Sequence, residues 1–105
     1  MSHAKPITDP LSRAWIEHQQ HERIPPNTIK RRQSVLRSIG NAGTATRDEV
    51  EAWWRARGEQ DLSPATRANE LATLRAFYKW AARWEHRTDD PTTRLDAPKV
   101  DRGLP

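Results

Sequence analysis

The stretch SPATRANELATLRAFYKWAARW, residues 63–84, decides the fold that the sequence predicts. Ser63 is a favoured N-cap residue, and Pro64 suits the first position of a helix. Apolar side chains then recur at the spacing of one helix face, which predicts a long helix with one buried stripe that ends near residue 85. The stripe consists of Leu71, Leu74, Phe77, Tyr78 and Ala81.

An earlier stretch, PPNTIKRRQSVLRS at residues 25–38, repeats the opening of this helix. When the two Pro-x-Thr openings are aligned, Thr28 falls on Thr66 and Arg37 falls on Arg75. Pro-x-Thr is common at helix starts, so the repeat alone is also compatible with chance. Together with the charge pattern, it raises the question of whether both helices dock on one partner.

Three helices are predicted before the long one. Asp9 caps a helix over residues 9–23, which the Pro25-Pro26 pair ends. A second helix covers residues 26–39, and a third begins at Thr46, where Thr-Arg-Asp-Glu fits a capping box. No stretch alternates apolar and polar residues over more than a few positions, so the predicted fold class is all-α.

Composition sets the limits of size and compartment. The chain has 105 residues, which is one small domain, and its five Trp supply much of the apolar area. It contains no Cys, which excludes disulfides and thiolate metal sites. No apolar run reaches the roughly 18–20 residues that cross a bilayer, and no signal-peptide pattern is present. We therefore expect a cytoplasmic protein with no membrane partner.

The chain divides into three parts by composition. We expect residues 1–7 to be a flexible N-terminus and residues 8–87 to form the helical domain. From residue 88 onward the sequence is rich in Pro and balanced in charge, which predicts an extended linker with at most a short turn around Thr92–Leu95.

Positive charge is concentrated on two of the four predicted helices. The net charge is +4, and the helix over residues 26–39 has several Lys and Arg and no acidic residue. The long helix carries Arg67, Arg75, Lys79 and Arg83 against Glu70 and Glu85. A basic helix face is often merely solvated, but two such helices with matching openings favour nucleic-acid binding, because Lys and Arg attract phosphates and hydroxyl or amide groups read phosphates and base edges.

The end of the chain resembles the core-binding domain of tyrosine recombinases, the phage integrase and Xer-type family. The resemblance rests on a Ser-x-x-Thr opening, a Leu-x-x-Leu-Arg motif followed by aromatic residues, and an Asp-Pro…Pro-Lys…Leu-Pro exit. The matching residues are Ser63, Thr66, Leu71, Leu74, Arg75, Phe77 or Tyr78, Trp80, Asp90-Pro91, Leu95, Pro98-Lys99 and Leu104-Pro105, with Asn27, Thr28 and Leu36 matching an earlier family helix. The resemblance covers roughly residues 8–105.

Two positions depart from the family pattern. The Tyr that the family carries four residues after Thr28 is Arg32 here, and the usual Arg of the long helix is Asn69. We expect the alkyl stem of Arg32 to pack while its charge reaches the edge of the core. Both changes bear on individual DNA contacts and not on the fold.

The resemblance implies a SAM-like four-helix bundle, followed by an extended linker, that forms half of a clamp around duplex DNA. The helices over residues 26–39 and 64–85 would lie over the major groove of the recombination core site. The catalytic domain, with its Tyr nucleophile, would begin just after Leu104-Pro105, so we expect this chain to be a fragment without enzyme activity or cofactor. Because residues 1–7 are short, we also expect the arm-site domain of many integrases to be missing.

The family also implies partners and a setting. Besides double-stranded DNA, these would be the protein's own catalytic domain and neighbouring protomers, in a bacterial cell and with a phage or mobile-element origin. The predicted DNA-contacting residues are Thr28, Lys30, Arg31, Ser34 and Arg37 in the first basic helix, and Thr66, Arg67, Asn69, Thr73, Arg75 and Lys79 in the second. Of these, Thr66, Asn69 and Thr73 are predicted on the outward face, and Arg75 alternatively supports the edge of the core.

Other chemistry is weakly supported by the sequence. Tyr78 falls on the buried stripe, which favours a core role over a nucleophile. His18 and His21 have a spacing compatible with metal binding, but no further ligand is evident. Trp53 and Trp54 cannot both face inward, so we expect one to be half exposed, in a core role rather than in base stacking.

Two other functions remain open. One is a helical protein–protein adaptor that presents Trp54, Trp80 or Trp84 as an aromatic patch. The other is a small stand-alone regulator with a helix-turn-helix, although the gap of about 20 residues between the two basic helices argues against that motif.

Overall fold

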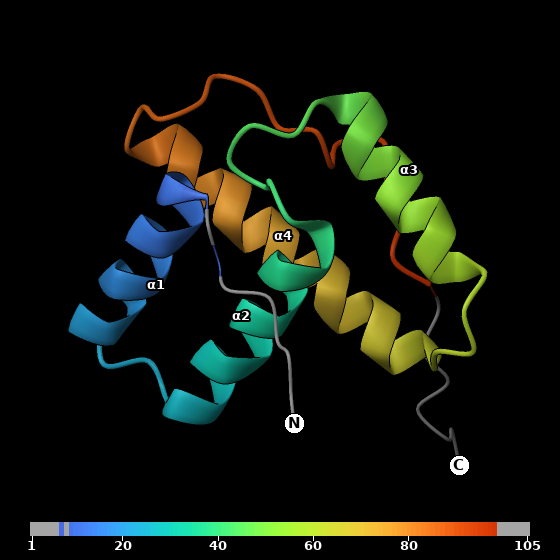
Figure 1. The fold of residues 1–105 in the computed structure, drawn as a ribbon, viewed down its shortest axis with the longest axis horizontal. Helices are drawn as coiled ribbons and strands as arrows, with labels where there is room; N and C mark the ends of the chain where they lie inside the picture. Colours follow the sequence, from blue (N-terminus) through green and yellow to red (C-terminus); the bar gives the residue numbers. More distant parts are fainter. Residues whose placement is uncertain (1–6, 8, 99–105) are drawn as a thin grey trace, which may run out of the picture.

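The computed structural model describes residue 7 and residues 9–98 (Figure 1). The helices are α1 (Pro10–His21), α2 (Pro26–Ile39), α3 (Arg47–Gly58) and α4 (Pro64–Arg83). Over these residues there is no strand, so the predicted all-α class and the order of the four helices are confirmed. α4 runs through the middle of the molecule, with α1 and α2 on one side and α3 on the other (Figure 1).

Local capping chemistry starts three of the helices where the sequence predicts. The Asp9 carboxylate accepts a hydrogen bond from the backbone N–H of Ser12, Thr46 and Glu49 form a reciprocal capping box, and Ser63 accepts from the N–H of Thr66. Each of these bonds satisfies an N–H group that has no partner within its helix. α2 differs, because Pro25 occupies its N-cap position and provides no side-chain bond.

The loop before α3 closes over the start of α1. The backbone N–H of Gly43 donates to Asp9 Oδ2 at 2.8 Å, and a Cβ atom at Gly43 would lie 2.5 Å from the same oxygen. Only glycine allows this approach without displacing the carboxylate. The contact ties α1 to a segment 34 residues away in the chain.

α1 and α4 end earlier than predicted, for one shared reason. Arg23 and Glu85 each adopt a left-handed backbone with a φ of 60°. The N–H of Ile24 then donates to the carbonyl of Gln19, and the N–H of His86 donates to the carbonyl of Ala81. These are Schellman-type ends that place a charged residue where glycine is usual, which explains why the sequence did not reveal them.

The core forms around α4. The predicted stripe of Leu71, Leu74, Phe77, Tyr78 and Ala81 is confirmed, since all five residues are fully buried. Trp15 of α1 meets Phe77 edge to face at 5.4 Å, while Leu36 of α2 and Val50 of α3 pack into the same cluster. Apolar burial of this kind is the main force that stabilises the bundle.

The segment after α4 corrects one expectation. We expected residues 88–105 to leave the domain, but Leu95 is buried and belongs to the core cluster. The predicted short turn is present, because the N–H of Leu95 donates to the carbonyl of Thr92, and Arg94 pairs with Glu51 of α3 at 2.7 Å. The helical domain therefore extends to at least residue 95. The rest of the predicted linker, residues 99–105, lies outside the described residues, as do residues 1–6.

No helix in the described part of the chain has both the length and the apolar character that a bilayer-crossing helix needs.

Candidate nucleic-acid interface

A groove runs between α2 and α4, and we call it the α2–α4 groove. It contains two hollows, and Arg31 of α2 and Asn69 of α4 line both. The remaining lining residues are Thr28, Arg32, Ser34 and Val35 from α2, Thr66, Glu70, Ala72 and Thr73 from α4, and Arg57 from α3. The two helices with matching openings therefore place six of their eleven predicted contact residues on one surface, namely Thr28, Arg31, Ser34, Thr66, Asn69 and Thr73.

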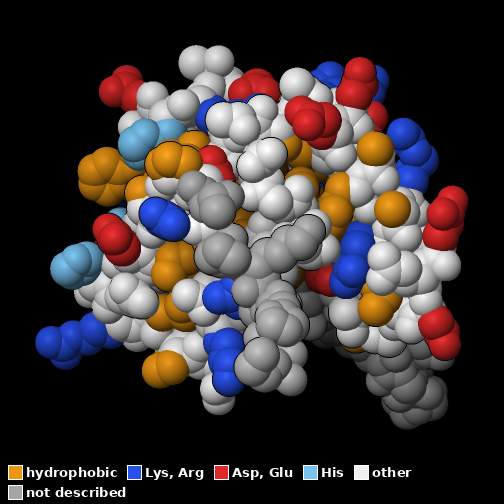
Figure 2. Space-filling view, viewed as in Figure 1, with side chains coloured by type: hydrophobic (Ala, Val, Ile, Leu, Met, Phe, Trp, Pro, Cys, Tyr) orange, Lys and Arg blue, Asp and Glu red, His pale blue; other side chains and the backbone are white. Residues whose placement is uncertain are grey.

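Helix geometry explains why these side chains meet. Thr28 and Arg31 lie three positions apart on α2, as do Thr66 and Asn69 on α4, so each pair shares one side of its helix. Arg31, Thr66 and Asn69 are exposed, while Thr28 is half-buried. Lys30 and Ser34 are also exposed. In the space-filling view, Lys and Arg side chains are visible in the lower part of this face, and both acidic and basic side chains are visible on the side where α3 lies (Figure 2).

One residue of the groove departs from its predicted orientation. Thr73 was predicted on the outward face of α4, but only 6% of it is exposed. Its hydroxyl donates to the carbonyl oxygen of Asn69 at 3.0 Å. Thr73 is therefore buried at the floor of the groove, and its hydroxyl is already bonded within α4.

Five predicted contact residues do not line the groove, namely Lys30, Arg37, Arg67, Arg75 and Lys79. Arg37 faces α1, where it lines a hollow with Arg13 and Glu17. The guanidinium of Arg67 stacks 4.4 Å above the ring of Trp54. On the next flank of α4, Arg75 donates to the carbonyl oxygen of Leu95, which agrees with the alternative role at the edge of the core. Lys79 lies further along α4, beside two Trp side chains.

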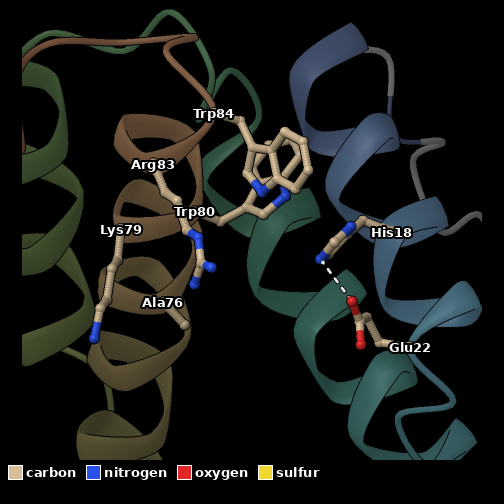
Figure 3. Close-up of a pocket in the computed structure, with 7 residues that line it drawn as sticks. All are labelled: His18, Glu22, Ala76, Lys79, Trp80, Arg83 and Trp84. Carbon is tan, nitrogen blue, oxygen red and sulfur yellow. Dashed lines mark ion pairs between the residues drawn. The ribbon is translucent and has the colours of Figure 1, made fainter.

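Those two Trp side chains line a second surface, at the carboxyl end of α4. We call it the Trp-lined hollow (Figure 3), and its lining residues are His18, Glu22, Ala76, Lys79, Trp80, Arg83 and Trp84. Trp84 is 56% exposed, whereas Trp80 is half-buried and Trp54, the third member of the predicted patch, is buried. His18 faces Trp84 from α1 with a centroid separation of 5.8 Å.

Comparison with known proteins agrees with the fold. Residues 39–85 match the family described as phage integrase, N-terminal SAM-like domain. This chain carries a phage integrase SAM-like domain. The SAM-like domain is homologous to the N-terminal part of Xer tyrosine recombinases, as the following relatives show.

The relatives are bacterial proteins of greater length. The tyrosine recombinase XerD of Caulobacter vibrioides is 41% identical over 71 residues, which cover 68% of this chain and 23% of the relative. XerD of Xanthomonas campestris pv. campestris is 39% identical over 99 residues, with 90% of this chain and 31% of the relative covered. XerC of Herpetosiphon aurantiacus is 32% identical over 71 residues, with 68% and 23% covered. This chain therefore spans about a quarter to a third of the length of these relatives, and no solved structure gives a significant match.

Arg32 of the SAM-like domain is held by α1. Its Nη1 donates to Gln19 Oε1 at 2.5 Å, and its guanidinium lies 5.3 Å from the centroid of the Trp15 ring. Burial, and then the neighbouring charge of Arg31, lower the pKa of Arg32. Arg32 is half-buried, and its charge is turned towards α1 at the edge of the groove.

An ion pair between α3 and α4 in the SAM-like domain was missed by the sequence analysis. Arg57 Nε donates to Glu70 Oε1 at 3.1 Å, and Arg57 Nη2 pairs with Glu70 Oε2. Glu70 is only 8% exposed and lines the α2–α4 groove. The available signal was that both residues lie at the edge of the apolar stripe of their own helix.

Tyr78 of the SAM-like domain is a core residue, as predicted. It is fully buried, and its hydroxyl donates to the carbonyl oxygen of Ala42 at 2.8 Å. Burial raises its pKa above the usual range, which opposes formation of a phenolate nucleophile. Trp53 is half-buried beside the buried Trp54, as the adjacent pair predicts.

Metal binding finds no further support at the His pair. Within residues 9–98 no group of three or more His, Cys, Asp or Glu side chains is placed to hold an ion. His18 instead contacts Trp80 and Trp84 and lies 3.6 Å from the carboxylate of Glu22.

Proposed function

We propose that this chain is the core-binding part of a site-specific tyrosine recombinase and grips duplex core-site DNA with the α2–α4 groove. The observation that carries the proposal is that Arg31 of α2 lines the same two hollows as Asn69 of α4. The family adds independent support, because its longer relatives are tyrosine recombinases by name.

The groove offers the chemistry that duplex DNA requires. Arg31 lines the groove, Lys30 is exposed next to it on α2, and both are cations that attract phosphates. Ser34, Thr66 and Asn69 present hydroxyl and amide groups that can bond phosphates or base edges. α2 has no side-chain cap, and the helix dipole at its start favours a phosphate, although the N–H groups of Thr28 and Ile29 already donate to the carbonyl of Pro25.

In this proposal the SAM-like domain grips and positions DNA, and the covalent chemistry belongs to a catalytic part of the longer recombinase. The chain has a single Tyr, and burial withholds it from any attacking role. Alone, the domain should bind DNA weakly. In a two-domain clamp, binding of one domain raises the effective concentration of the other at the DNA, and an isolated domain lacks this gain.

Fluorescence anisotropy with a labelled duplex tests the proposal. The dissociation constant should rise steeply between about 50 mM and about 200 mM salt, because phosphate contacts release counterions. Replacement of Arg31 should weaken binding and reduce the salt dependence. Affinity that is independent of both salt and Arg31 would refute the groove as the binding surface.

A second candidate function is supported by the exposure of Trp84. The Trp-lined hollow combines this aromatic surface with Lys79 and Arg83, as an interface with another protein would (Figure 3). Under this alternative the partner is a neighbouring protomer. Sedimentation of the wild type and of Trp84→Ala at equal concentration tests it, since loss of self-association with unchanged DNA affinity would assign the hollow to protein contact.

A further inference from the structure

We infer that Arg57 prepares the α2–α4 groove for DNA by neutralising the carboxylate of Glu70, so that Arg57 acts as a positioning residue for DNA binding. This inference rests on the proposed function. It concerns a residue of α3, a helix that the sequence analysis did not assign to the interface.

The position of the Glu70 carboxylate is unfavourable for DNA binding. It follows Asn69 directly on α4, and it lines the same hollow as Arg31 and Thr66. A carboxylate there repels phosphates, and because it is only 8% exposed, water screens its charge poorly. The repulsion acts within about one Debye length, ~10 Å at 0.1 M salt, which includes the neighbouring contact residues.

Arg57 cancels this charge from a fixed position. It bonds both carboxylate oxygens of Glu70, one through Nε and the other through Nη2. Its Nη1 donates to Gln60 Oε1 at 3.2 Å, and its guanidinium lies 6.0 Å from the centroid of the Trp53 ring. A two-point Arg–carboxylate pair is a geometrically specific arrangement, so the cation is held on Glu70 and is not free to seek a phosphate elsewhere.

If Arg57 acts by neutralising Glu70, the variants should follow an order of DNA affinities that differs from the order expected if the ion pair only stabilised the fold. Arg57→Ala uncovers the carboxylate and should lower affinity by about tenfold or more. Arg57→Ala combined with Glu70→Gln has the net charge of the wild type and should recover affinity to within about threefold. Glu70→Gln alone removes the anion and frees a cation at the groove, so it should bind about three- to tenfold more tightly than the wild type.

A matched control separates this local effect from net charge. Glu17→Gln makes the same change of charge on α1, where Glu17 is exposed and lines a different hollow. Because Glu17 does not line the α2–α4 groove, the Glu17→Gln variant should raise DNA affinity by less than about twofold.

The experiment is anisotropy with one labelled duplex at about 100 mM salt, a condition at which screening is moderate, on the wild type and these four variants. Circular dichroism and thermal unfolding confirm that each variant is folded. If Arg57→Ala does not fold, the comparison of Glu70→Gln with Glu17→Gln decides the inference on its own. A Glu70→Gln affinity that does not exceed that of Glu17→Gln overturns it, as does a double variant that stays as weak as Arg57→Ala. A wild type that fails to bind the duplex at all would instead refute the proposed function.

Discussion

Tyr78 and Arg87 both donate hydrogen bonds to the carbonyl oxygen of Ala42, at 2.8 Å and 3.2 Å. The guanidinium of Arg87 also lies 5.1 Å from the centroid of the Tyr78 ring. One backbone oxygen in the loop before α3 thus joins α4 to the segment that follows it. The only Tyr of the chain therefore has a structural role that is set by three separate parts of the sequence.

Tyr78→Phe should destabilise the domain by about 1 kcal/mol, since it removes one buried hydrogen bond without leaving a cavity. Arg87 still donates to the Ala42 oxygen, which keeps the loss near this value. Urea unfolding followed by circular dichroism measures the change. DNA affinity should stay within about twofold, because Tyr78 is buried and does not line the groove, and phosphate contacts dominate affinity. A large loss of affinity in a fully folded variant would contradict the core assignment.

Stability should fall in acid in part through Asp89. Its hydrogen bond to Arg87, and then the charge of Arg87, hold the pKa of Asp89 below its usual range. A carboxylate with a lowered pKa in the folded state stabilises the fold fully above its unfolded pKa, near 3.9, and loses that contribution as pH falls through the lower folded value. Glu51 is shifted in the same direction by Arg94.

Asp89→Asn tests this linkage. Because the Asp89 side chain is 55% exposed, we expect its pair to contribute only about 0.5 kcal/mol near neutral pH. The variant should therefore have a slightly lower melting temperature at pH 7 and converge with the wild type near pH 2, as the pair is lost in both. An equal difference at both pH values would argue against the ion pair.

Glu85→Gly should stabilise the domain by about 0.5–1 kcal/mol, because glycine adopts a left-handed backbone without the steric cost of a Cβ. Arg23→Gly should act in the same direction at the end of α1, where φ is also 60°. Glu59→Gly is the matched control, since Glu59 ends α3 with an ordinary φ of −86°. Thermal unfolding should show a higher melting temperature for Glu85→Gly and Arg23→Gly than for the wild type, and no increase for Glu59→Gly.

Arg31→Ala should weaken duplex binding by roughly 1 kcal/mol and flatten the plot of log affinity against log salt by about one unit. Arg37→Ala removes the same charge from the same helix, but on the side that faces α1. Its effect should be clearly smaller. Equal effects of the two variants would mean that α2 contributes a general positive field and not a contact surface.

Local chemistry explains what the sequence could predict. Asp9, Thr46 and Ser63 mark the helix starts because N-cap bonds join residues only three positions apart. The ends of α1 and α4 were not predictable in this way, because the left-handed residues there, Arg23 and Glu85, are not glycines.

The candidate site was predictable only where it depends on one helix at a time. Helical spacing placed Arg31 and Asn69 towards a shared groove. It misplaced Thr73, because α4 is covered from both sides and its buried arc also includes Glu70. The partners of Arg67 and Arg75 come from α3 and from the segment after α4. Such long-range partners leave no periodic signal in the sequence.

The seat of Leu95 in the core has a consequence for how the protein folds during synthesis. Until residue 95 has emerged from the ribosome, the core cluster lacks one of its buried apolar members. A nascent chain in which all four helices have formed therefore still lacks part of its core. That part is supplied by the non-helical segment after α4.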